Sequence, residues 1–284
     1  MKTNNKKSVE MNAANEEYSA NAAPELRVAY FQQDIAWEAP EENYRLVEEA
    51  FATMEGQADM LIVPETFNTG FSDNMAAMAE EPGGPTLKFA HRMAQQHDAL
   101  FVGTWTVKDQ SELHPGQTVV YNRLHWVRPD GSYGYYDKGH TFRVSTEASQ
   151  LERGQHRSIF EWRGWRIKPA ICYDLRFPKW LRTGNPPDYD LILLCANWPG
   201  SRAAAWDTLL RARAIENEAY AVGVNRVGVD GTGIPYAGHS AAIDFKGLAL
   251  SACDPEVAQV RTATLDKAKL EHFREHWPFY LDFD

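Results

Sequence analysis

The order of hydrophobic and polar positions predicts strands alternating with helices along most of this chain. Short apolar runs that end at Pro, Gly, Asn or Asp are typical of buried strands, and apolar residues that recur every three or four positions are typical of helices. A helix is expected to open at Pro40, where proline suits the first turn, because apolar residues then fall on one face: Val47, Ala50, Phe51 and Met54.

The expected elements combine hairpins with β–α units. Strands are expected at 26–33, 60–63, 99–107, 118–127, 133–136, 159–162, 165–171, 191–195, 221–227, 240–245 and 248–253, and further helices at 87–97 and 203–220. This mixture indicates a mixed sheet covered by helices on one side, and two such sheets face to face would give a layered α/β sandwich.

Residues 1–25 differ in composition from the rest of the chain. They are rich in Asn, Ala, Glu and Lys, and Tyr18 is their only aromatic residue. Because they offer little apolar surface to offset the entropy lost on ordering, we expect a flexible extension; a folded arm in an oligomer is the alternative. We find no internal repeat and no later low-complexity linker, so one domain is expected over 26–284.

Charge and cysteine content restrict the class of protein. A formal net charge of −10 argues against nucleic acid as the main partner, because phosphate binding requires a basic surface. The three cysteines, Cys172, Cys195 and Cys253, form no C-x-x-C pair and suit a reducing compartment. With neither an apolar leader segment nor a run long enough to span a membrane, the chain is expected to be cytoplasmic and to bind no membrane.

The segment AICYDLRFP (170–178) holds the first candidate for chemistry. It reads as a buried strand that stops at Cys172 and continues into a polar turn. A thiol at such a turn can lie exposed at the edge of a sheet, where it can attack a carbonyl group. Taken alone, Cys172 fits better a cysteine that packs as a small hydrophobe. Thiol redox sensing is less suitable, because no second cysteine lies nearby in the sequence.

Two more polar residues stand where apolar strands end. Glu65 follows the run LIVP, and Lys138 follows the run YGYYD. Each has an ordinary explanation, since Glu65 could cap its turn and Lys138 could be solvated beside Asp137. Together with Cys172, however, they supply a base, a cation and a thiol, which are the groups that acyl transfer through a thioester requires.

Three motifs in this order resemble the signatures of the nitrilase superfamily: PETFNTGF (64–71), YDKGHTF (136–142) and CYDLRFP (172–178). The resemblance continues through ANWPGSR (196–202), LLRARAIENEAY (209–220), GVNRVGVDGTG (223–233) and REHWPFY (274–280), and within the superfamily it is greatest to the ω-amidase branch, the bacterial 2-oxoglutaramate amidases. It implies a four-layer α-β-β-α sandwich and a subunit pairing that extends the sandwich to eight layers, hence a homodimer or a higher homo-oligomer.

The resemblance also implies roles for individual residues. Cys172 would be the nucleophile, Glu65 the general base, and Lys138 a stabiliser of the oxyanion together with the backbone N–H of Tyr173. Glu147 falls in the segment that supplies a second glutamate, which would keep Lys138 charged; the alternative is an ordinary loop glutamate. The implied chemistry needs no metal and no organic cofactor.

The implied substrate is a small amide with a carboxylate and a keto group at its far end. A planar guanidinium can bind both oxygens of such a carboxylate, so Arg176 is the first candidate, followed by Arg202 and Arg143; a structural ion pair is the alternative for each. Three apolar residues are expected around the aliphatic part of the substrate: Trp198, Phe71 and Phe67. Trp206 is assigned to the core or a dimer face instead.

The lysine motif departs from the family pattern. Close relatives have a bulky or basic residue and then a leucine around the histidine, whereas this chain has Gly139 and Thr141. We interpret Gly139 as a more flexible turn with a side chain removed near the pocket. The leading hypothesis is therefore an amidase acting on 2-oxoglutaramate or 2-oxosuccinamate. The alternatives are another superfamily hydrolase, acting on nitriles or N-carbamoyl amino acids, and a catalytically silent binding or scaffold protein.

Overall fold

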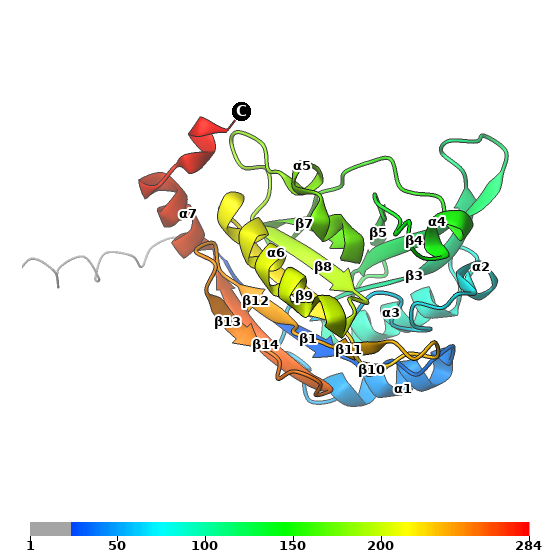
Figure 1. The fold of residues 1–284 in the computed structure, drawn as a ribbon. Helices are drawn as coiled ribbons and strands as arrows, with labels where there is room; N and C mark the ends of the chain where they lie inside the picture. The colour runs from blue at the N-terminus through cyan, green and yellow to red at the C-terminus, as the bar shows by residue number, and fades with distance from the viewer. Residues whose placement is uncertain (1–23, 284) are drawn as a thin grey trace, which may run out of the picture.

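The computed structural model describes residues 24–283, so most of the expected flexible extension, 1–25, lies outside the described residues. Two six-stranded sheets form the centre of the molecule (Figure 1). The first has the order β14-β1-β2-β3-β4-β5, which corresponds to Gln259–Asp266, Glu25–Gln32, Met60–Ile62, Leu100–Gln110, Thr118–Val127 and Tyr133–Asp137. The second has the order β13-β12-β9-β8-β7-β6, which corresponds to Ala249–Ala252, Ala241–Ile243, Tyr220–Asn225, Leu191–Ala196, Trp165–Ile171 and Phe160–Trp162.

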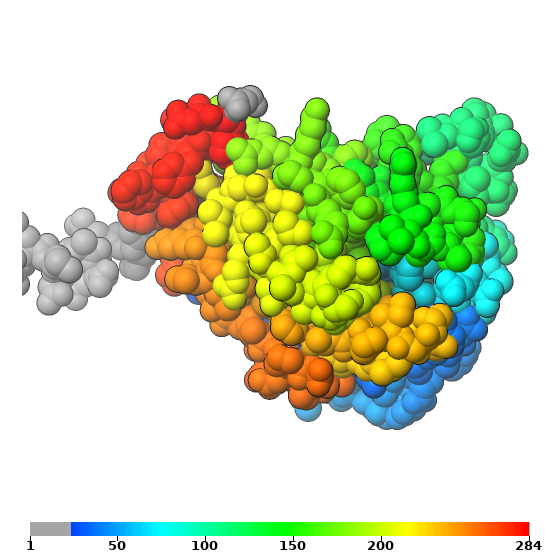
Figure 2. Space-filling view, in the orientation of Figure 1, coloured from blue at the N-terminus to red at the C-terminus, as the bar shows by residue number. Residues whose placement is uncertain are grey.

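Helices cover the outer faces of both sheets. Helices α1 (Pro40–Phe51) and α3 (Pro85–His97) pack on the first sheet, and α6 (Ala203–Glu216) packs on the second, which it covers in the space-filling view (Figure 2). The remaining helices are α2 (Met75–Met78), α4 (Glu147–Gln150), α5 (Pro178–Leu181) and α7 (Lys267–His276), with 3-10 turns η1 (Cys172–Arg176), η2 (Gly200–Arg202) and η3 (Phe279–Asp282). This arrangement is the expected α-β-β-α sandwich. None of the described helices is long and apolar enough to cross a membrane.

Two apolar layers hold the sandwich together. One lies between the sheets and under α6, where Tyr30, Ile62, Ile171 and Leu194 are fully buried. The other lies between the first sheet and helices α1 and α3, which bury Val47, Phe51 and Phe89. The face predicted for α1 is thus the buried one, although the helix ends at Phe51 and Met54 packs from beyond its end.

The C-terminal part of the fold differs most from the expectation. The sequence pattern did not indicate β14, α7 or the small hairpin of β10 (Val227–Val229) and β11 (Pro235–Ala237). The expected helix over 203–220 ends at Glu216, because Glu218 adopts a positive φ of 45° that stops the helix, and Tyr220 instead begins β9. The side chains of β14 are mostly exposed or half-buried, so this strand has no clear apolar alternation to detect.

The sheets bring several strand ends to one region. Strands β2 and β3 are parallel, and β5 is antiparallel to β4, which is antiparallel to β3, so β2 and β5 end at the same edge of the first sheet. Strands β7 and β8 are parallel and end together in the second sheet. Residues that directly follow these strands can therefore meet between the two sheets.

Candidate active site

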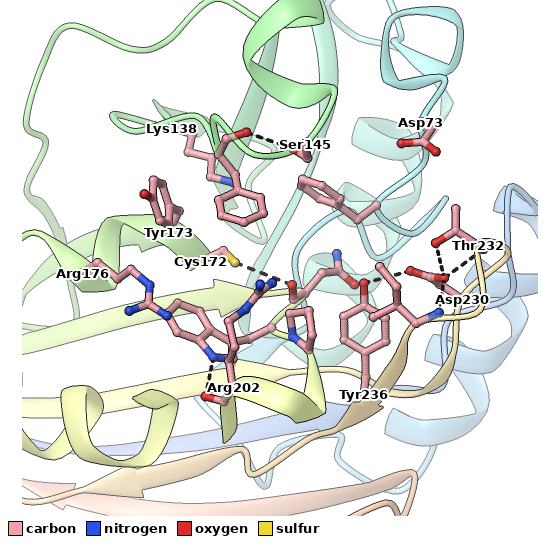
Figure 3. A pocket seen from close by; sticks show the side chains of 16 residues that line it. Asp73, Lys138, Ser145, Cys172, Tyr173, Arg176, Arg202, Asp230, Thr232 and Tyr236 are labelled. Atoms are coloured by element: carbon pink, nitrogen blue, oxygen red, sulfur yellow. Dashed lines mark hydrogen bonds between the residues drawn. The ribbon is translucent and has the colours of Figure 1, made fainter. Parts of the chain in front are cut away.

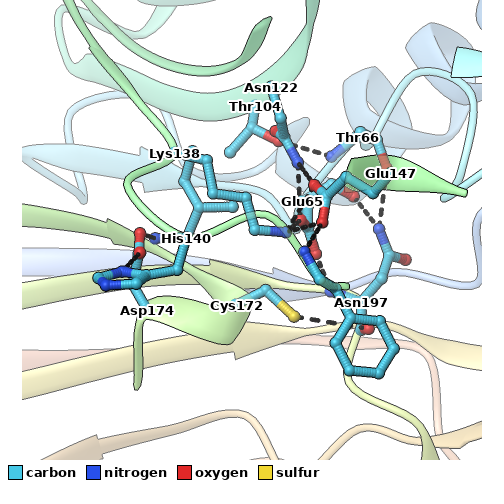
Figure 4. Close-up of polar contacts among 12 residues, drawn as sticks. Glu65, Thr66, Thr104, Asn122, Lys138, His140, Glu147, Cys172, Asp174 and Asn197 are labelled. Carbon is cyan, nitrogen blue, oxygen red and sulfur yellow. Dashed lines mark hydrogen bonds and ion pairs between the residues drawn. The ribbon is translucent and has the colours of Figure 1, made fainter. Parts of the chain in front are cut away.

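The structure brings Glu65, Lys138, Glu147 and Cys172 together between the two sheets (Figure 4). The Lys138 ammonium donates hydrogen bonds of 2.8 Å to Oε1 of Glu65 and 2.8 Å to Oε1 of Glu147. The side chain of Lys138 is 1% exposed and those of both glutamates are 0% exposed. Both ion pairs are thus removed from water. Charge–charge interactions are stronger in this buried, low-dielectric environment than in solvent.

Two asparagines and the turn after β2 hold Glu65 in place. Asn122 in β4 donates to Oε1 of Glu65 (2.8 Å), and the backbone N–H of Asn197, just after β8, donates to Oε2 (2.7 Å). The Asn197 amide also donates to the main-chain oxygen of Glu65 (2.6 Å). Thr66 has a positive φ of 42°, and its N–H donates to Oγ1 of Thr104 (2.7 Å). Both carboxylate oxygens of Glu65 are therefore fixed by donors.

These supporting residues were not predicted. Asn122 is a polar residue within the strand run 118–127, and a buried polar side chain in a strand normally requires a partner. Asn197 lies in the quoted motif ANWPGSR directly after an apolar strand, the same position that pointed to Glu65 and Cys172. Polar residues at strand ends were thus the available signal for Asn197.

Cys172 directly follows β7 in a left-handed backbone conformation. Its φ is 43°, which costs of order 1–3 kcal/mol for a residue other than glycine. Asp174 fixes the turn, because its Oδ2 accepts hydrogen bonds from the N–H of Ile171 (3.1 Å) and the hydroxyl of Tyr136 (2.7 Å). The thiol points toward the main-chain oxygen of Asn197 at 3.7 Å. The strained turn thus aims the sulfur into the space between the sheets.

The surroundings set the charge of each group. Burial and the neighbouring Glu65 raise the pKa of Cys172 well above its usual range, against the opposing effect of Lys138, so the thiol is protonated at neutral pH. Burial alone would lower the pKa of Lys138, but Glu147 and Glu65 outweigh it and raise that pKa, so the ammonium stays charged. Burial and Glu65 together raise the pKa of Glu147 although Lys138 opposes them.

A cavity of about 110 Å³ opens over Cys172 (Figure 3). Five of the residues expected to contact substrate line it: Phe71, Tyr173, Arg176, Trp198 and Arg202. Lys138 and Asn197 line it as well, so the cavity reaches the buried charge cluster. The cavity therefore connects solvent with the thiol.

Two arginines in the cavity have no carboxylate partner within the described part of the chain. The Arg176 guanidinium lies 4.8 Å from the centre of the Trp198 ring, and that of Arg202 lies 5.2 Å from the centre of the Phe142 ring. Neither forms a salt bridge with any residue of 24–283. The structural ion pair considered for them is thus absent from the described part of the chain, and both cations are available to a ligand.

Two other sequence candidates lie outside the cavity. Arg143 is not among the lining residues. The expectation that Phe67 lines the pocket is wrong, because Phe67 is fully buried on the outer side of the first sheet, 5.7 Å from the ring of Phe101. Trp206 is fully buried and packs 5.7 Å from Trp198, which agrees with its assignment to the core.

The cavity wall across from Arg176 is acidic. Asp230 and Asp73 lie there in Figure 3. Asp230 accepts hydrogen bonds from the N–H groups of Thr232 (2.9 Å) and Ile234 (3.0 Å) and from the Tyr236 hydroxyl (2.9 Å). The Asp230 carboxylate thus accepts hydrogen bonds mainly from its own loop. With Arg176 and Arg202 on one side and Asp230 and Asp73 on the other, the cavity has a cationic and an anionic side.

Gly139 has a packing role that the sequence did not reveal. A Cβ at this position would lie 2.5 Å from the Trp180 ring, closer than side chains can approach. The Trp180 indole N–H donates to the Tyr136 hydroxyl (2.8 Å), which in turn donates to Asp174. The space that Gly139 frees is therefore filled by Trp180, and the greater flexibility expected of the turn stays a prediction.

The cavity has no group of side chains spaced to hold a metal ion. Among residues 24–283 such a group occurs at His272, Glu275 and His276, which are exposed on α7. The three described cysteines are free thiols.

Comparisons with known proteins identify the family of this chain. The sequence profile of the family described as carbon-nitrogen hydrolase matches residues 27–275. The chain is 39% identical over 263 residues to "Omega-amidase YafV" of Escherichia coli strain K12, covering 92% of this chain and 98% of that protein. It is 31% identical over 258 residues to "2-oxoglutaramate amidase" of Bacillus subtilis strain 168, covering 90% of this chain and 96% of that one.

Solved structures give the same result. XC1258 from Xanthomonas campestris, described as a CN-hydrolase superfamily protein with an arsenic adduct in the active site, is 42% identical to this chain and superimposes with a TM-score of 0.86. The match covers 92% of this chain and 98% of that structure. The family profile, the relatives that match over nearly their whole length and the shared fold lead to one conclusion. This chain belongs to the carbon–nitrogen hydrolase family of the nitrilase superfamily.

Proposed function

We propose that this protein is an ω-amidase that hydrolyses the terminal amide of a short 2-oxo dicarboxylic acid monoamide, 2-oxoglutaramate or 2-oxosuccinamate. The products are ammonia and the 2-oxo dicarboxylate. The observation that carries the proposal is one cavity with the Cys172 thiol at its base and, in its wall, Arg176 and Arg202, which pair with no carboxylate of residues 24–283. The names of the relatives from Escherichia coli and Bacillus subtilis favour the same activity.

The first half of the reaction forms a thioester. Because the Cys172 thiol is protonated at neutral pH, a base must take its proton, and Glu65 is the adjacent carboxylate. The sulfur attacks the amide carbon, and the carbonyl oxygen becomes an oxyanion. The Lys138 ammonium meets this charge together with the N–H of Tyr173, which lies in the first turn of η1, where backbone N–H groups have no partner within the helix. Glu65 returns its proton to the amide nitrogen, the C–N bond breaks, and ammonia leaves.

The second half of the reaction releases the acid. Glu65 takes a proton from water, and the resulting hydroxide attacks the thioester carbon. The C–S bond then breaks, and the thiolate recovers the proton from Glu65. Glu147 acts on Lys138 rather than on substrate, because its two oxygens lie 2.8 and 3.0 Å from the ammonium and keep it charged and in place.

The two arginines select the substrate by charge. Their guanidinium groups can bind the far carboxylate of the amide with charge-assisted hydrogen bonds, and Trp198 and Phe71 offer apolar surface to the short chain between the two ends. The same proposal includes a homodimer and a cytoplasmic location, in accord with the resemblance and with the free cysteines.

One experiment tests the proposal directly. The protein is mixed with 2-oxoglutaramate, 2-oxosuccinamate, a short nitrile and an N-carbamoyl amino acid, and both ammonia release and protein mass are recorded. We expect turnover of the two oxo amides and an acyl adduct on Cys172, with both signals absent from Cys172→Ala. Preferential turnover of the nitrile or the carbamoyl compound would assign another hydrolase activity. No turnover at all, with Cys172 inert to iodoacetamide, would indicate a binding or scaffold protein.

A further inference from the structure

A second cavity lies between β7, α5 and the loops at 157–159 and 182–189, and it shares no lining residue with the cavity over Cys172. Its volume is about 500 Å³. Four of the residues that line it are basic: Arg157, Lys168, Lys179 and Arg182. Asp188 is the one carboxylate in this lining. A concave surface with this charge excess attracts anions, although the chain as a whole is acidic.

Lys168 is the unusual member of this group. It projects from β7 and is only 3% exposed, yet its ammonium makes no hydrogen bond or salt bridge with any residue of 24–283. Burial and the nearby Arg157 together lower the pKa of Lys168 to about 8, although Asp188 and Asp174 oppose this. A largely buried cation with no carboxylate partner among the described residues is costly unless water or an anion in the cavity contacts its ammonium.

The two nearby carboxylates are already used by other donors. Oδ1 of Asp188 accepts hydrogen bonds from the Thr183 hydroxyl (2.8 Å) and the N–H of Gly184 (3.2 Å). Asp174 accepts from Tyr136 and Ile171 and contacts His140. Neither carboxylate forms an ion pair with Lys168. Within residues 24–283, Lys168 thus has no anionic partner, and its ammonium at the cavity is free to bind a ligand.

The rim of the cavity offers further free donors. Lys179 is exposed on α5 and forms no salt bridge with a described residue. Arg157 uses Nη1 for the main-chain oxygen of Lys179 (3.2 Å), which leaves its other nitrogens free. Arg182 is more fully engaged, since Nη1 donates to the main-chain oxygen of Glu216 (2.7 Å) and its guanidinium stacks on the Phe283 ring at 3.6 Å.

We propose that this cavity is an anion site that binds a phosphate-type oxyanion, with Lys168 at its base and Lys179 and Arg157 at its rim. A tetrahedral oxyanion accepts hydrogen bonds in several directions at once, so it can contact ammonium groups at the base and the rim together. Two lysines supply compact point charges and the arginine supplies a fork of N–H donors. The site does not depend on the proposed amidase activity.

Calorimetric titration with inorganic phosphate at low ionic strength tests the site. We expect saturable binding to the wild-type protein, at least a tenfold loss of affinity in Lys168→Met, and a several-fold loss in Lys179→Gln. Lys108→Gln is the matched control, because Lys108 is a partly exposed lysine of β3 that pairs with Glu81 at 3.8 Å, outside the cavity. Absence of saturable binding, or an affinity that Lys168→Met leaves unchanged, overturns the proposal.

Proton uptake provides an independent readout. Sulfate has the same shape as phosphate and does not titrate near pH 8. With a pKa of about 8, about half of the Lys168 side chains are neutral at that pH. Bound sulfate should raise that pKa and draw up to about half a proton into the protein, seen as a binding enthalpy that changes with the buffer. Binding without such uptake, or with the same uptake in Lys168→Met, would contradict a role for Lys168 at the base of the site.

Thermal melts separate binding from a packing role of Lys168. We expect Lys168→Met, without phosphate, to melt at or above the wild-type temperature, because an unpaired buried charge is removed. Phosphate should raise the melting temperature of the wild type and leave that of the variant unchanged. If Lys168→Met does not fold, the exposed variants Lys179→Gln and Arg157→Gln decide: weaker phosphate binding in both supports the site, and unchanged binding overturns it.

Discussion

The indole of Trp180 occupies the space that a side chain at residue 139 would need, and a Cβ on Gly139 would lie 2.5 Å from that ring. Lys138 directly precedes this contact and reaches the buried carboxylates of Glu65 and Glu147. Trp180 also binds the Tyr136 hydroxyl, which contacts Asp174 in the turn of Cys172. A contact outside the cavity therefore bears on the position of two of the proposed reacting groups.

The first prediction concerns this contact. Gly139→Leu should lower the free energy of unfolding by about 1–3 kcal/mol, the usual cost of overpacking, and should reduce kcat by displacing Lys138. The double variant Gly139→Leu/Trp180→Ala should regain part of both losses, because the small residue at 180 frees the space. Urea unfolding and steady-state kinetics of the single and double variants measure this coupling. Strictly additive effects would show that the two residues do not compete for space.

The second prediction concerns the charge around the thiol. Glu147 helps to raise the pKa of Cys172, so Glu147→Gln should lower it and shift the pH profile of iodoacetamide alkylation toward lower pH. Amide hydrolysis should nevertheless fall by about tenfold or more, because Lys138 loses one of the carboxylates that hold it.

Glu161→Gln serves as the control for this charge change, since Glu161 is an exposed residue of β6 outside the cavity. Its alkylation profile should coincide with that of the wild type. A shift toward higher pH in Glu147→Gln would contradict the electrostatic account of the Cys172 environment.

The third prediction concerns the two arginines of the cavity. Arg176→Leu and Arg202→Leu should each raise KM for 2-oxoglutaramate by about 10- to 100-fold, which corresponds to the loss of a charge-assisted hydrogen bond. Neither variant should raise KM for a short aliphatic amide without a carboxylate. Arg92→Leu is the matched control, because Arg92 pairs with Glu48 outside the cavity. Equal losses with the charged and the neutral amide would assign the arginines a structural role instead.

The fourth prediction concerns Asp190, which attaches α7 to the second sheet. Its carboxylate, 1% exposed, contacts Arg166 (2.6 Å), Arg274 (3.0 Å) and Lys267 (3.2 Å). Burial alone would raise the pKa of Asp190, but hydrogen bonds from Arg166 and the charges of Arg166 and Lys267 lower it from 3.8 to about 2. A carboxyl whose pKa is lower in the folded than in the unfolded protein stabilises the fold when the pH is above its unfolded-state pKa. The contribution of Asp190 is therefore complete above about pH 4 and is lost as the pH falls toward 2.

The expected size of that contribution is about 2 kcal/mol, from the shift of the pKa alone. Asp190→Asn should therefore show a flatter loss of stability between pH 4 and pH 2 than the wild type. At pH 7 it should be less stable by about 3–5 kcal/mol, because Arg274 is left buried without a carboxylate. Urea unfolding at several pH values measures both effects, and parallel curves for the two proteins would contradict this assignment.

The sequence was most informative where an apolar strand stops at a polar residue. Glu65 and Lys138 follow β2 and β5, Cys172 follows β7, and the structure brings all three together. Strand β4 was predicted with its observed bounds, Thr118–Val127, because its composition and the following turn at Asp130-Gly131 are distinctive. Local pattern was sufficient in these cases.

The remaining features depend on contacts that local pattern does not encode. Phe67 lies two residues after Glu65, yet its ring turns to the opposite side of the sheet, because Thr66 takes a left-handed conformation between them. The packing of Trp180 against Gly139 joins segments far apart in the sequence. Strand β14 is recognisable only through its partner, since seven of its eight side chains are not fully buried.

The pairing of β14 with β1 has a consequence for biosynthesis. The two strands form an antiparallel ladder in register from Glu25 opposite Asp266 to Gln32 opposite Gln259, so strands from opposite ends of the described chain are neighbours. While the protein is being translated, β1 emerges from the ribosome early, and its outer edge then has no hydrogen-bonding partner until β14 follows. The first sheet can be completed only after β14 has been synthesised, and nascent chains must keep the edge of β1 from pairing with one another in the meantime.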